Sequence, residues 1–508
     1  MISTSGYDLI IIGAGAGGAT LARRLATSGK KILILERGPW LPREKRNWDV
    51  RAVAVDRHYE TKEVWLDKDD NPVRSNAHYN VGGNTKFWGA ALFRFRERDF
   101  EQVPHPNGIS PEWPLKYRDF EPYYALAEKL YDCHGLRGED PTAPPISEEY
   151  PFPPISHEPA MQALVDALKA KGLHPFHLPT AIRMNEDRRF LSQCIRCETC
   201  DGFPCLVGAK ADAEWNGARP AIEYANVTLV TEARVNRLLT SPSGREIAGV
   251  ETEFDGGTHI FKSDIVVAAC GAINSAALLL RSANDRHPNG LANASDQVGR
   301  NYMYHLLGAM VAVSDLPNPT VFEKTVGLND FYWGEPDYAW PMGNIQSTGQ
   351  VLPDMLANLF KEPLPGMTFD QMYANATDWW FMTEDLPDPN NRVTWERGTI
   401  KIRYTENNRA SFDRLRRRWS VILEELGYGK SFLSLKVGID GVAHQCGTCR
   451  FGTDPKTSVL DIHCRAHDVD NLYVVDSSFY PSSAALNPTH TLLANALRVG
   501  DHLLERMR

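Results

Sequence analysis

Three glycines near the start of the chain have the spacing of a dinucleotide-binding turn. Gly13, Gly15 and Gly18 form a G-x-G-x-x-G pattern directly after the apolar run 7–12. The first glycine of such a pattern permits a tight turn, the second lets a pyrophosphate approach the backbone, and the third lets the next helix pack closely on the strand. Free N–H groups at the helix N-terminus attract the phosphates. The pattern therefore predicts a dinucleotide site.

An acidic residue follows at the spacing that this site needs. The run 19–28 predicts a helix, 31–35 predicts a second strand, and Glu36 closes that strand. A carboxylate at this point can accept hydrogen bonds from two ribose hydroxyls and would repel a 2′-phosphate. The alternative, a glycine-rich turn in an ordinary strand–helix–strand unit, accounts for fewer of these features.

Two further clusters could carry chemistry. The loop 80–89 contains Gly82 and Gly83 beside Phe87 and Trp88, which suggests backbone laid against a flat ring. Four cysteines, Cys194, Cys197, Cys200 and Cys205, form two C-x-x-C steps and a fourth thiol. They could ligate zinc or an iron–sulfur cluster, form two disulfides, or stay reduced; we predict no metal site there.

The elements that must position these residues recur late in the chain. A buried strand at 264–269, a helix at 273–281 and a buried strand at 471–476 resemble the opening unit. We therefore predict an α/β fold with a discontinuous Rossmann-like FAD-binding domain and an inserted, sheet-based (α+β) substrate-binding domain. The predicted boundaries are 1–105, 206–305 and 441–508 for the first domain, 106–205 for an excursion that carries the cysteines, and 306–440 for the second domain.

Local patterns give more detailed expectations. The segments 226–239 and 246–254 predict the strands of one hairpin, 310–313 and 399–404 predict strands, and 158–171 and 410–426 predict helices. Met342, Trp379, Trp380 and Phe381 are expected in the hydrophobic core. Asn487 before Pro488 and Thr489 predicts the cap of a helix over 490–505.

Composition excludes several classes of function. The 508 residues carry a formal net charge of −9 with both signs mixed, which argues against nucleic acid or an anionic membrane as partner. The N-terminus has no basic segment followed by an apolar one, and the apolar run 265–280 is broken by Gly271, Asn274 and Ser275. We therefore expect a cytoplasmic protein without membrane contact.

These motifs, in this order, resemble the glucose–methanol–choline (GMC) family of flavoprotein oxidoreductases over most of the chain. The matching segments are the opening glycines with Glu36, Gly82-Gly83, Asn226-Val227-Thr228 through Ala233-Arg234-Val235, Ala268-Ala269-Cys270-Gly271-Ala272, Gly299-Arg300-Asn301 with His305, Asn391-Arg392-Val393-Thr394, the run His444 to Gly452, and the terminal strand, loop and helix.

Within this family the C-terminal loop is similar to one branch. Many members have a second histidine there, whereas this chain has Asn487-Pro488-Thr489, which resembles pyranose oxidases and related bacterial glycoside oxidases. The cysteine cluster also resembles those bacterial enzymes, some of which oxidise carbon 3 of glycosides, including C-glycosides. In fungal pyranose oxidase a histidine of the glycine loop is bonded to the flavin; Phe87 matches that position, so the resemblance implies noncovalent FAD.

The resemblance also implies roles for individual residues. Oxidation of a secondary alcohol needs a base for the hydroxyl proton and an acceptor for the hydride, and a neutral imidazole and a flavin suit these tasks. His444 is the expected base, and Asn487 is expected to hold the same hydroxyl. His305 and His490 are interpreted as structural. Asp476 is expected to contact the ribityl hydroxyls of the cofactor. Pro488 and Thr489 are expected at a helix N-terminus that favours negative charge on the reduced flavin. The full set of expected cofactor-binding residues is Gly13, Gly15, Gly18, Glu36, Arg37, Gly82, Gly83, Asn84, Val235, Ala269, Gly271, Asp476, Pro488 and Thr489.

The leading hypothesis is an FAD-dependent oxidase or dehydrogenase that converts a secondary ring hydroxyl of a sugar or glycoside, at carbon 3 before carbon 2, to the keto-sugar. Dioxygen or another small acceptor would take the electrons. The main alternative is a dehydrogenase of a non-sugar alcohol with a quinone or protein acceptor. A redox-neutral flavin-containing lyase and a flavin-binding protein without catalysis remain as further alternatives, and the assembly state is left open.

Overall fold

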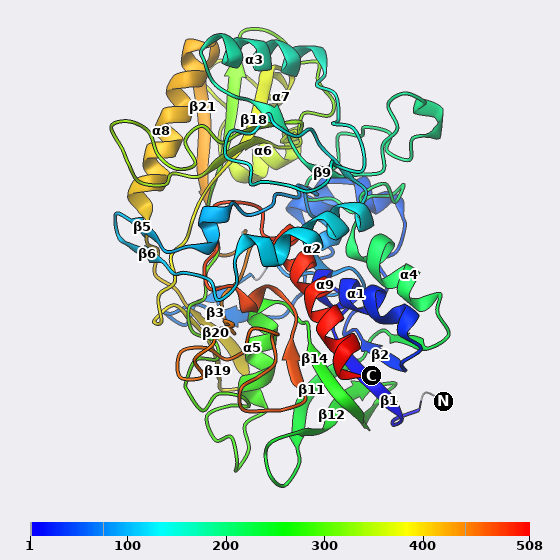
Figure 1. The fold of residues 1–508 in the computed structure, drawn as a ribbon. Helices are drawn as coiled ribbons and strands as arrows, with labels where there is room; N and C mark the ends of the chain where they lie inside the picture. Colours follow the sequence, from blue (N-terminus) through cyan, green and yellow to red (C-terminus); the bar gives the residue numbers. More distant parts are fainter. Residues whose placement is uncertain (1–2, 75, 442) are drawn as a thin grey trace.

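Segments from the start, middle and end of the chain share one parallel sheet. The computed structural model describes residues 3–74, 76–441 and 443–508. Five parallel strands lie in the order β10-β2-β1-β14-β22. Their bounds are Tyr7–Ile12 (β1), Ile32–Leu35 (β2), Val227–Val230 (β10), Ser263–Ala268 (β14) and Leu472–Val474 (β22). The predicted discontinuous Rossmann-like sheet is confirmed (Figure 1).

Three helices begin at the same edge of this sheet. Helix α1 (Ala16–Leu25) follows β1, α5 (Ala272–Arg281) follows β14, and the C-terminal helix α9 (Thr489–Arg506) follows β22 after a loop. Helix α9 packs against α1 and against α2 (Tyr117–Leu130), and all three lie together in Figure 1. Because neighbouring parallel strands end at one edge, the positive N-termini of these helices converge there.

A small antiparallel sheet flanks the parallel one. It contains β11 (Arg234–Thr240), β12 (Ile247–Phe254) and β13 (Gly257–Phe261). The prediction of one uninterrupted strand over 226–239 is wrong, because β10 belongs to the parallel sheet and β11 to the antiparallel one. Glu232 has a positive φ of 55° between them and redirects the chain.

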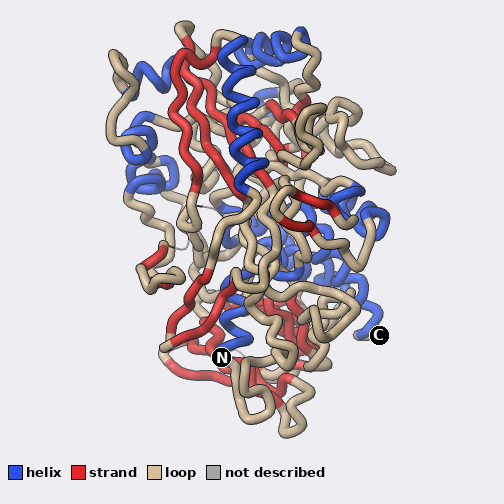
Figure 2. The backbone as a smooth tube through the Cα atoms, turned by 90° about the vertical axis from the view of Figure 1, so that its left-hand side faces the viewer, coloured by secondary structure: helices blue, strands red, loops and turns tan. Residues whose placement is uncertain are grey.

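The second layer is an antiparallel sheet of six strands, which confirms the expected sheet-based unit. Its order is β21-β15-β18-β17-β16-β8. The bounds are Phe176–His177 (β8), Leu306–Ser314 (β15), Val326–Leu328 (β16), Asn344–Ser347 (β17), Ala376–Thr383 (β18) and Tyr428–Val437 (β21). Helix α8 (Arg409–Glu425) packs across β15, β18 and β21, in front of the long strands in Figure 2. It buries Phe412, Leu415 and Trp419 at helical spacing against this sheet.

Shorter elements join the two layers. A four-stranded sheet combines β3 (Trp65–Leu66) and β4 (Pro72–Val73) with β19 (Arg392–Glu396) and β20 (Thr399–Arg403). Further elements are the strand pairs β5 (Val103–His105) with β6 (Gly108–Ser110) and β7 (Cys133–His134) with β9 (Thr180–Ala181), and the helices α3 (Pro159–Ala170), α4 (Arg219–Ile222), α6 (Pro353–Leu359) and α7 (Phe369–Asn375). Within the described ranges, every helix is too short or too polar to cross a bilayer.

Candidate active site

One cavity of about 590 Å³ reaches from the glycine turn after β1 to the six-stranded sheet. This volume is typical of a site for a small molecule or cofactor. The structure places most of the predicted site residues on its wall: Gly13, Gly15, Glu36, Arg37, Gly83, Asn84, Val235, Ala269, Gly271, His444, Asp476, Asn487, Pro488 and Thr489. Gly18 and Gly82 are absent from the lining.

The glycine turn is shaped by close backbone contacts. Gly13 has a φ of +103°, and a Cβ there would overlap the carbonyl oxygen of Ala269. A Cβ on Gly18 would overlap the Gly13 carbonyl and lie 3.1 Å from the Ile11 side chain, so Gly18 permits close helix–strand packing. Gly15 differs, because nothing lies within 4 Å of its Cβ position. Its backbone therefore faces open cavity space at the N-terminus of α1.

Gly17 is a site residue that the sequence analysis missed. It lines the cavity, and a Cβ there would overlap the carbonyl oxygen of Val475, just beyond β22. The G-x-G-x-x-G pattern leaves this position free, because the contact is made by a segment more than 450 residues later in the chain.

Glu36 is buried with its carboxylate held by backbone N–H groups. Oε2 accepts from the Ala14 amide at 2.8 Å, and Oε1 accepts from the Gly38 amide at 2.9 Å. Burial raises the pKa of this carboxyl, against the opposing effect of those amides. Because a carboxylate has about four acceptor sites, each oxygen can still accept from a ribose hydroxyl. The guanidinium carbon Cζ of the neighbouring Arg37 lies 3.7 Å from the centroid of the Tyr79 ring.

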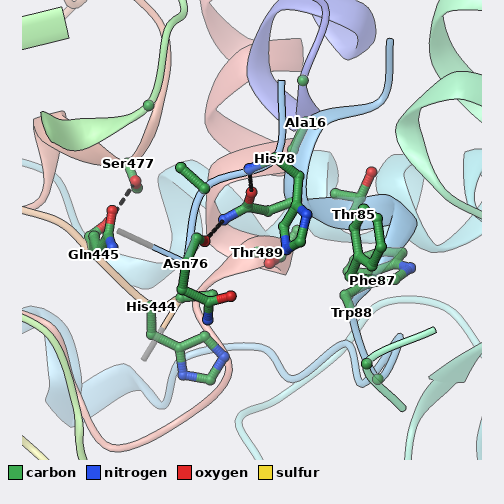
Figure 3. Close-up of a pocket in the computed structure, with 18 of the residues that line it drawn as sticks. Ala16, Asn76, His78, Thr85, Phe87, Trp88, His444, Gln445, Ser477 and Thr489 are labelled. Atoms are coloured by element: carbon green, nitrogen blue, oxygen red, sulfur yellow. Dashed lines mark hydrogen bonds between the residues drawn. The ribbon is translucent and has the colours of Figure 1, made fainter. Parts of the chain in front are cut away.

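The second glycine loop lies against the first. The Gly82 amide donates to the Ala14 carbonyl at 2.9 Å, and the Cβ position of Gly83 is 3.3 Å from the Gly15 Cα. The Asn84 side chain accepts from the His78 amide and donates to the Asn76 carbonyl. These bonds hold the segment 76–78 at the cavity, where Figure 3 shows Asn76, His78, Phe87 and Trp88 around the space.

A buried ion pair anchors the same loop. Lys86 Nζ lies 2.9 Å from Asp212 Oδ2 and 2.7 Å from Glu214 Oε2, and all three side chains are buried. Charge pairing with both carboxylates raises the pKa of the Lys86 ammonium, against the desolvation that lowers it. Two buried carboxylates around one lysine fix the loop that carries Phe87.

Asp476 joins three elements at the sheet edge. Its carboxylate accepts from the Gly271 amide at 3.0 Å, from the Ser478 amide at 2.9 Å, and from the hydroxyls of Ser275 and Ser478. It therefore ties the end of β14 and the start of α5 to the C-terminal segment. Asp476 also lines the cavity, and its contact with the ribityl chain stays a prediction.

His444 reaches the cavity from the C-terminal segment and is labelled with Asn76 among the lining residues in Figure 3. Its Nδ1 lies 2.9 Å from Nδ1 of the fully buried His305. Desolvation and the neighbouring His305 lower the pKa of His444 to about 3. The imidazole is therefore neutral at neutral pH, the form that can accept a proton.

Asn487 does not cap helix α9. The helix begins at Thr489 with Pro488 as its N-cap, and no side chain makes a cap hydrogen bond. The cap prediction is therefore wrong, although the helix is confirmed. Among the residues that the structure describes, none supplies a hydrogen-bond partner for the buried Asn487 Oδ1 on the wall of the cavity. His490, one turn into the helix, is absent from the lining and contacts the Tyr124 carbonyl at 3.2 Å.

The six-stranded sheet supplies one cavity residue, Trp380, that was expected in the hydrophobic core. Trp379 and Phe381 are fully buried against α8, as expected, whereas Trp380 and Met382 line the cavity. Successive strand residues point to opposite faces, so β18 serves both. Gln346 pairs with Trp380 in the register and lines the cavity, and its buried Oε1 has no hydrogen-bond partner within the described ranges. The alternation of successive strand residues between two faces could have indicated from the sequence that Trp379 and Trp380 lie on opposite faces.

The four clustered cysteines line a second, small cavity. In the described part of the chain the cysteines are free thiols, and no group of three or more His, Cys, Asp or Glu side chains could hold a metal ion. Two backbone N–H groups approach the sulfurs: the Arg196 amide is 3.4 Å from Cys194 Sγ, and the Ala209 amide is 3.2 Å from Cys205 Sγ. Lys210 Nζ donates to the carbonyls of Trp88, Cys200 and Phe203, which ties this loop to the large cavity.

Comparison with known proteins gives concordant matches. The profile described as GMC oxidoreductase matches residues 7–307 in its N-terminal part and residues 431–496 in its C-terminal part. The chain is 32% identical to the 6‴-hydroxyparomomycin C oxidase of Streptomyces lividus and 31% identical to the paromamine 6′-oxidase of Streptomyces fradiae, each time over 97% of this chain and 90% of the relative. The crystal structure of pyridoxine 4-oxidase from Mesorbium loti has the same fold, with a TM-score of 0.72 and 20% identity over 98% of this chain and 99% of that one.

Proposed function

The chain belongs to the GMC oxidoreductase family, and on this premise we propose that it binds FAD noncovalently and oxidises a secondary ring hydroxyl of a sugar or glycoside. As a family member it is an FAD-dependent oxidoreductase that acts on CH–OH groups. The observation that carries the proposal is one cavity that joins the glycine turn and Glu36 to a neutral imidazole and an unpartnered amide oxygen.

The cavity wall fits a flavin dinucleotide. Gly15 and Gly271 leave open space where a Cβ would lie, and the first turn of α1 carries no acidic side chain that would repel phosphate. Glu36 would accept from the adenosine ribose. When bound, FAD supplies the acceptor for hydride.

Noncovalent attachment is supported by Phe87. By the resemblance of the glycine loop, this residue matches the position of the covalently bonded histidine of pyranose oxidase, and its ring has no nucleophilic atom. Acid precipitation of the holoprotein tests the point. Yellow flavin in the supernatant would support noncovalent binding, and flavin retained in the pellet would exclude it.

His444 would take the hydroxyl proton of the substrate, and Asn487 would orient that hydroxyl. A positioned base contributes about 10²- to 10⁴-fold to such a reaction, and it must be neutral to do so. Burial keeps His444 neutral at every pH well above 3. The Asn487 Oδ1 can accept a hydrogen bond from a substrate hydroxyl, because none of the described residues donates to it.

A polyhydroxylated substrate is supported by the polar atoms on the wall. Asn487 Oδ1, Gln346 Oε1 and Trp88 Nε1 are buried and have no hydrogen-bond partner in the described part of the chain. A buried polar group left unpaired costs about 1–3 kcal/mol, and sugar hydroxyls can both donate and accept. An aliphatic or steroid alcohol would leave most of these atoms unpaired. The two Streptomyces relatives described above are named as oxidases of 6‴-hydroxyparomomycin C and of paromamine.

The position of oxidation is the finer part of the proposal. We propose carbon 3, in preference to carbon 2, because Asn487-Pro488-Thr489 and the cysteine cluster resemble bacterial glycoside 3-oxidases. The names of the two aminoglycoside relatives instead point to a 6′ or 6‴ position. NMR of the product would distinguish a 3-keto sugar from oxidation at carbon 2 or carbon 6.

Anaerobic stopped-flow measurement of flavin bleaching tests the function. Free sugars, O-glycosides, C-glycosides, aminoglycosides and simple alcohols form the panel. Fast bleaching by sugars or glycosides supports the proposal; bleaching by non-sugar alcohols alone would favour the alternative dehydrogenase with a quinone or protein acceptor. No bleaching by any alcohol would leave a redox-neutral or non-catalytic flavoprotein. Peroxide formed under air would identify dioxygen as the acceptor.

A further inference from the structure

His305 and His444 are brought together by the register of two short segments. Met303 and Cys446 form an antiparallel bridge, with hydrogen bonds of 3.0 and 2.9 Å in both directions. Two residues onward in one segment and two residues back in the other, His305 faces His444 on the same side of this pairing. The result is the 2.9 Å contact between their Nδ1 atoms.

The other nitrogen of His305 determines which ring carries the shared hydrogen. His305 Nε2 lies 3.2 Å from the carbonyl oxygen of Ser483. A carbonyl only accepts hydrogen bonds, so Nε2 must carry the hydrogen. A neutral imidazole has a single N–H, and His305 Nδ1 is therefore an acceptor. The hydrogen between the two rings must then belong to His444 Nδ1.

This order leaves His444 Nε2 unprotonated on the ring that reaches the cavity. We propose that His305 is a positioning residue, which holds His444 in the tautomer whose Nε2 can accept the substrate hydroxyl proton. The inference rests on the proposed function, in which His444 is the base. As the proton arrives at Nε2, the Nδ1–H bond to His305 gains charge assistance, so the pair accommodates the imidazolium.

The surroundings support a neutral His305. Its ring is fully buried, and burial lowers its pKa to about 4. The carboxylate of Glu384 acts against this lowering of the pKa, but its Oε2 lies 3.0 Å from His105 Nε2 and its Oε1 accepts from the Ser110 hydroxyl at 2.7 Å. The Ser483 backbone is itself fixed, because its hydroxyl bonds to the backbone of Asp385.

Two variants separate positioning from packing. His305→Leu removes both hydrogen bonds, whereas His305→Gln retains a carbonyl that can accept from His444 and an amide that can donate to Ser483. The matched control is His490→Gln, because His490 is equally buried, contacts a backbone carbonyl through Nε2, and lies outside the cavity lining. All three holoproteins are compared by FAD content, thermal unfolding and anaerobic flavin reduction.

We expect His305→Leu to slow flavin reduction by about 100-fold with little change in the sugar dissociation constant. His305→Gln should recover to within about tenfold of the parent protein, and His490→Gln should react like the parent. In ¹⁵N spectra of histidine-labelled protein, assigned by the signals lost in His444→Ala, the parent should show His444 protonated at Nδ1 only. His305→Leu should change that pattern.

An unchanged reduction rate in His305→Leu, or a parent spectrum with His444 protonated at Nε2, would overturn the inference. If His305→Leu loses FAD, the comparison rests on His305→Gln: a rate as slow as in His444→Ala would also overturn it. If no alcohol bleaches the parent flavin, the proposed function fails, and the ¹⁵N spectrum still tests the tautomer.

Discussion

Gly17 and Trp380 line the same cavity for opposite reasons. At the glycine turn the wall is backbone, and a single added Cβ would overlap a carbonyl oxygen of the C-terminal segment. On the inner face of the six-stranded sheet the wall is made of side chains, with Trp380 and Gln346 paired across two strands. The first region is built from groups that every residue has, so an added side chain there either overlaps backbone, as at Gly17, or fills binding space, as at Gly15. The second region can change its side chains without changing its fold.

The most severe test of this contrast is Gly17→Ala. The added methyl group must displace α1 or the end of β22, and overpacking of this kind costs about 1–3 kcal/mol or more. We expect little folded, FAD-loaded protein, measured by flavin absorbance and thermal unfolding. The matched control is Gly15→Ala, whose Cβ meets no protein atom. It should fold but bind FAD more weakly, and equal behaviour of the two variants would contradict the backbone-built cradle.

At the side-chain end, His444→Ala should leave folding and FAD content intact. Flavin reduction by substrate should fall by about 1,000-fold, within the range for loss of a general base. Stopped-flow bleaching measures the rate, and the flavin spectrum measures occupancy. A variant that reduces its flavin as fast as the parent would remove His444 from the mechanism.

A smaller effect is expected from Gln346→Leu. Loss of the amide oxygen should weaken sugar binding by about tenfold, because a sugar hydroxyl is left without its partner. Reaction with a simple alcohol should stay unchanged. The control is Ile345→Val, whose side chain packs in the core on the other face of the same strand. It should lower thermal stability and leave sugar affinity unchanged. If Ile345→Val instead weakened sugar binding and Gln346→Leu did not, the assignment of the cavity face and the core face of this strand would be wrong.

The smallest expected effect concerns pH. The pKa values of His444 and His305 are lowered to about 3 and about 4, so both rings stay neutral from pH 8 to pH 5.5. Activity is present above the pKa of the base and lost as pH falls through it. The rate constant for flavin reduction should therefore change by no more than about twofold over that range. A decline centred near pH 6.5 would show that the catalytic end is not desolvated as the structure indicates.

The opening unit was predictable from local sequence. The apolar run 7–12, the glycine spacing and Glu36 each act on neighbours within about thirty residues, and the structure has a strand, helix and strand there. Gly17 was not predictable in the same way, since its constraint comes from Val475. The hairpin prediction failed at Glu232, whose positive φ turns the chain from one sheet into another. Glutamate is not a residue type that indicates a positive φ, so nothing in the sequence indicated this turn.

The residues at the catalytic end of the cavity were less predictable from the sequence, because their roles depend on tertiary structure. Because Trp379 and Trp380 are both apolar, the sequence predicted both in the hydrophobic core. The packing of α8 on one face of β18 buries Trp379 there and leaves Trp380 on the cavity wall. Asn487 has the residue type of a helix cap, yet its amide oxygen lies unpartnered at the cavity. His305 was interpreted as structural until the Met303–Cys446 bridge placed it against His444.

The sequence by itself determined the family, the nucleotide-binding unit and the candidate base, because each is encoded by residue types at short, fixed spacing. Only the tertiary structure decided which face of β18 meets the cavity, why position 17 needs glycine, and which nitrogen of His444 is free. Those properties depend on contacts between separate elements of the chain, and local residue patterns do not carry the register of such contacts.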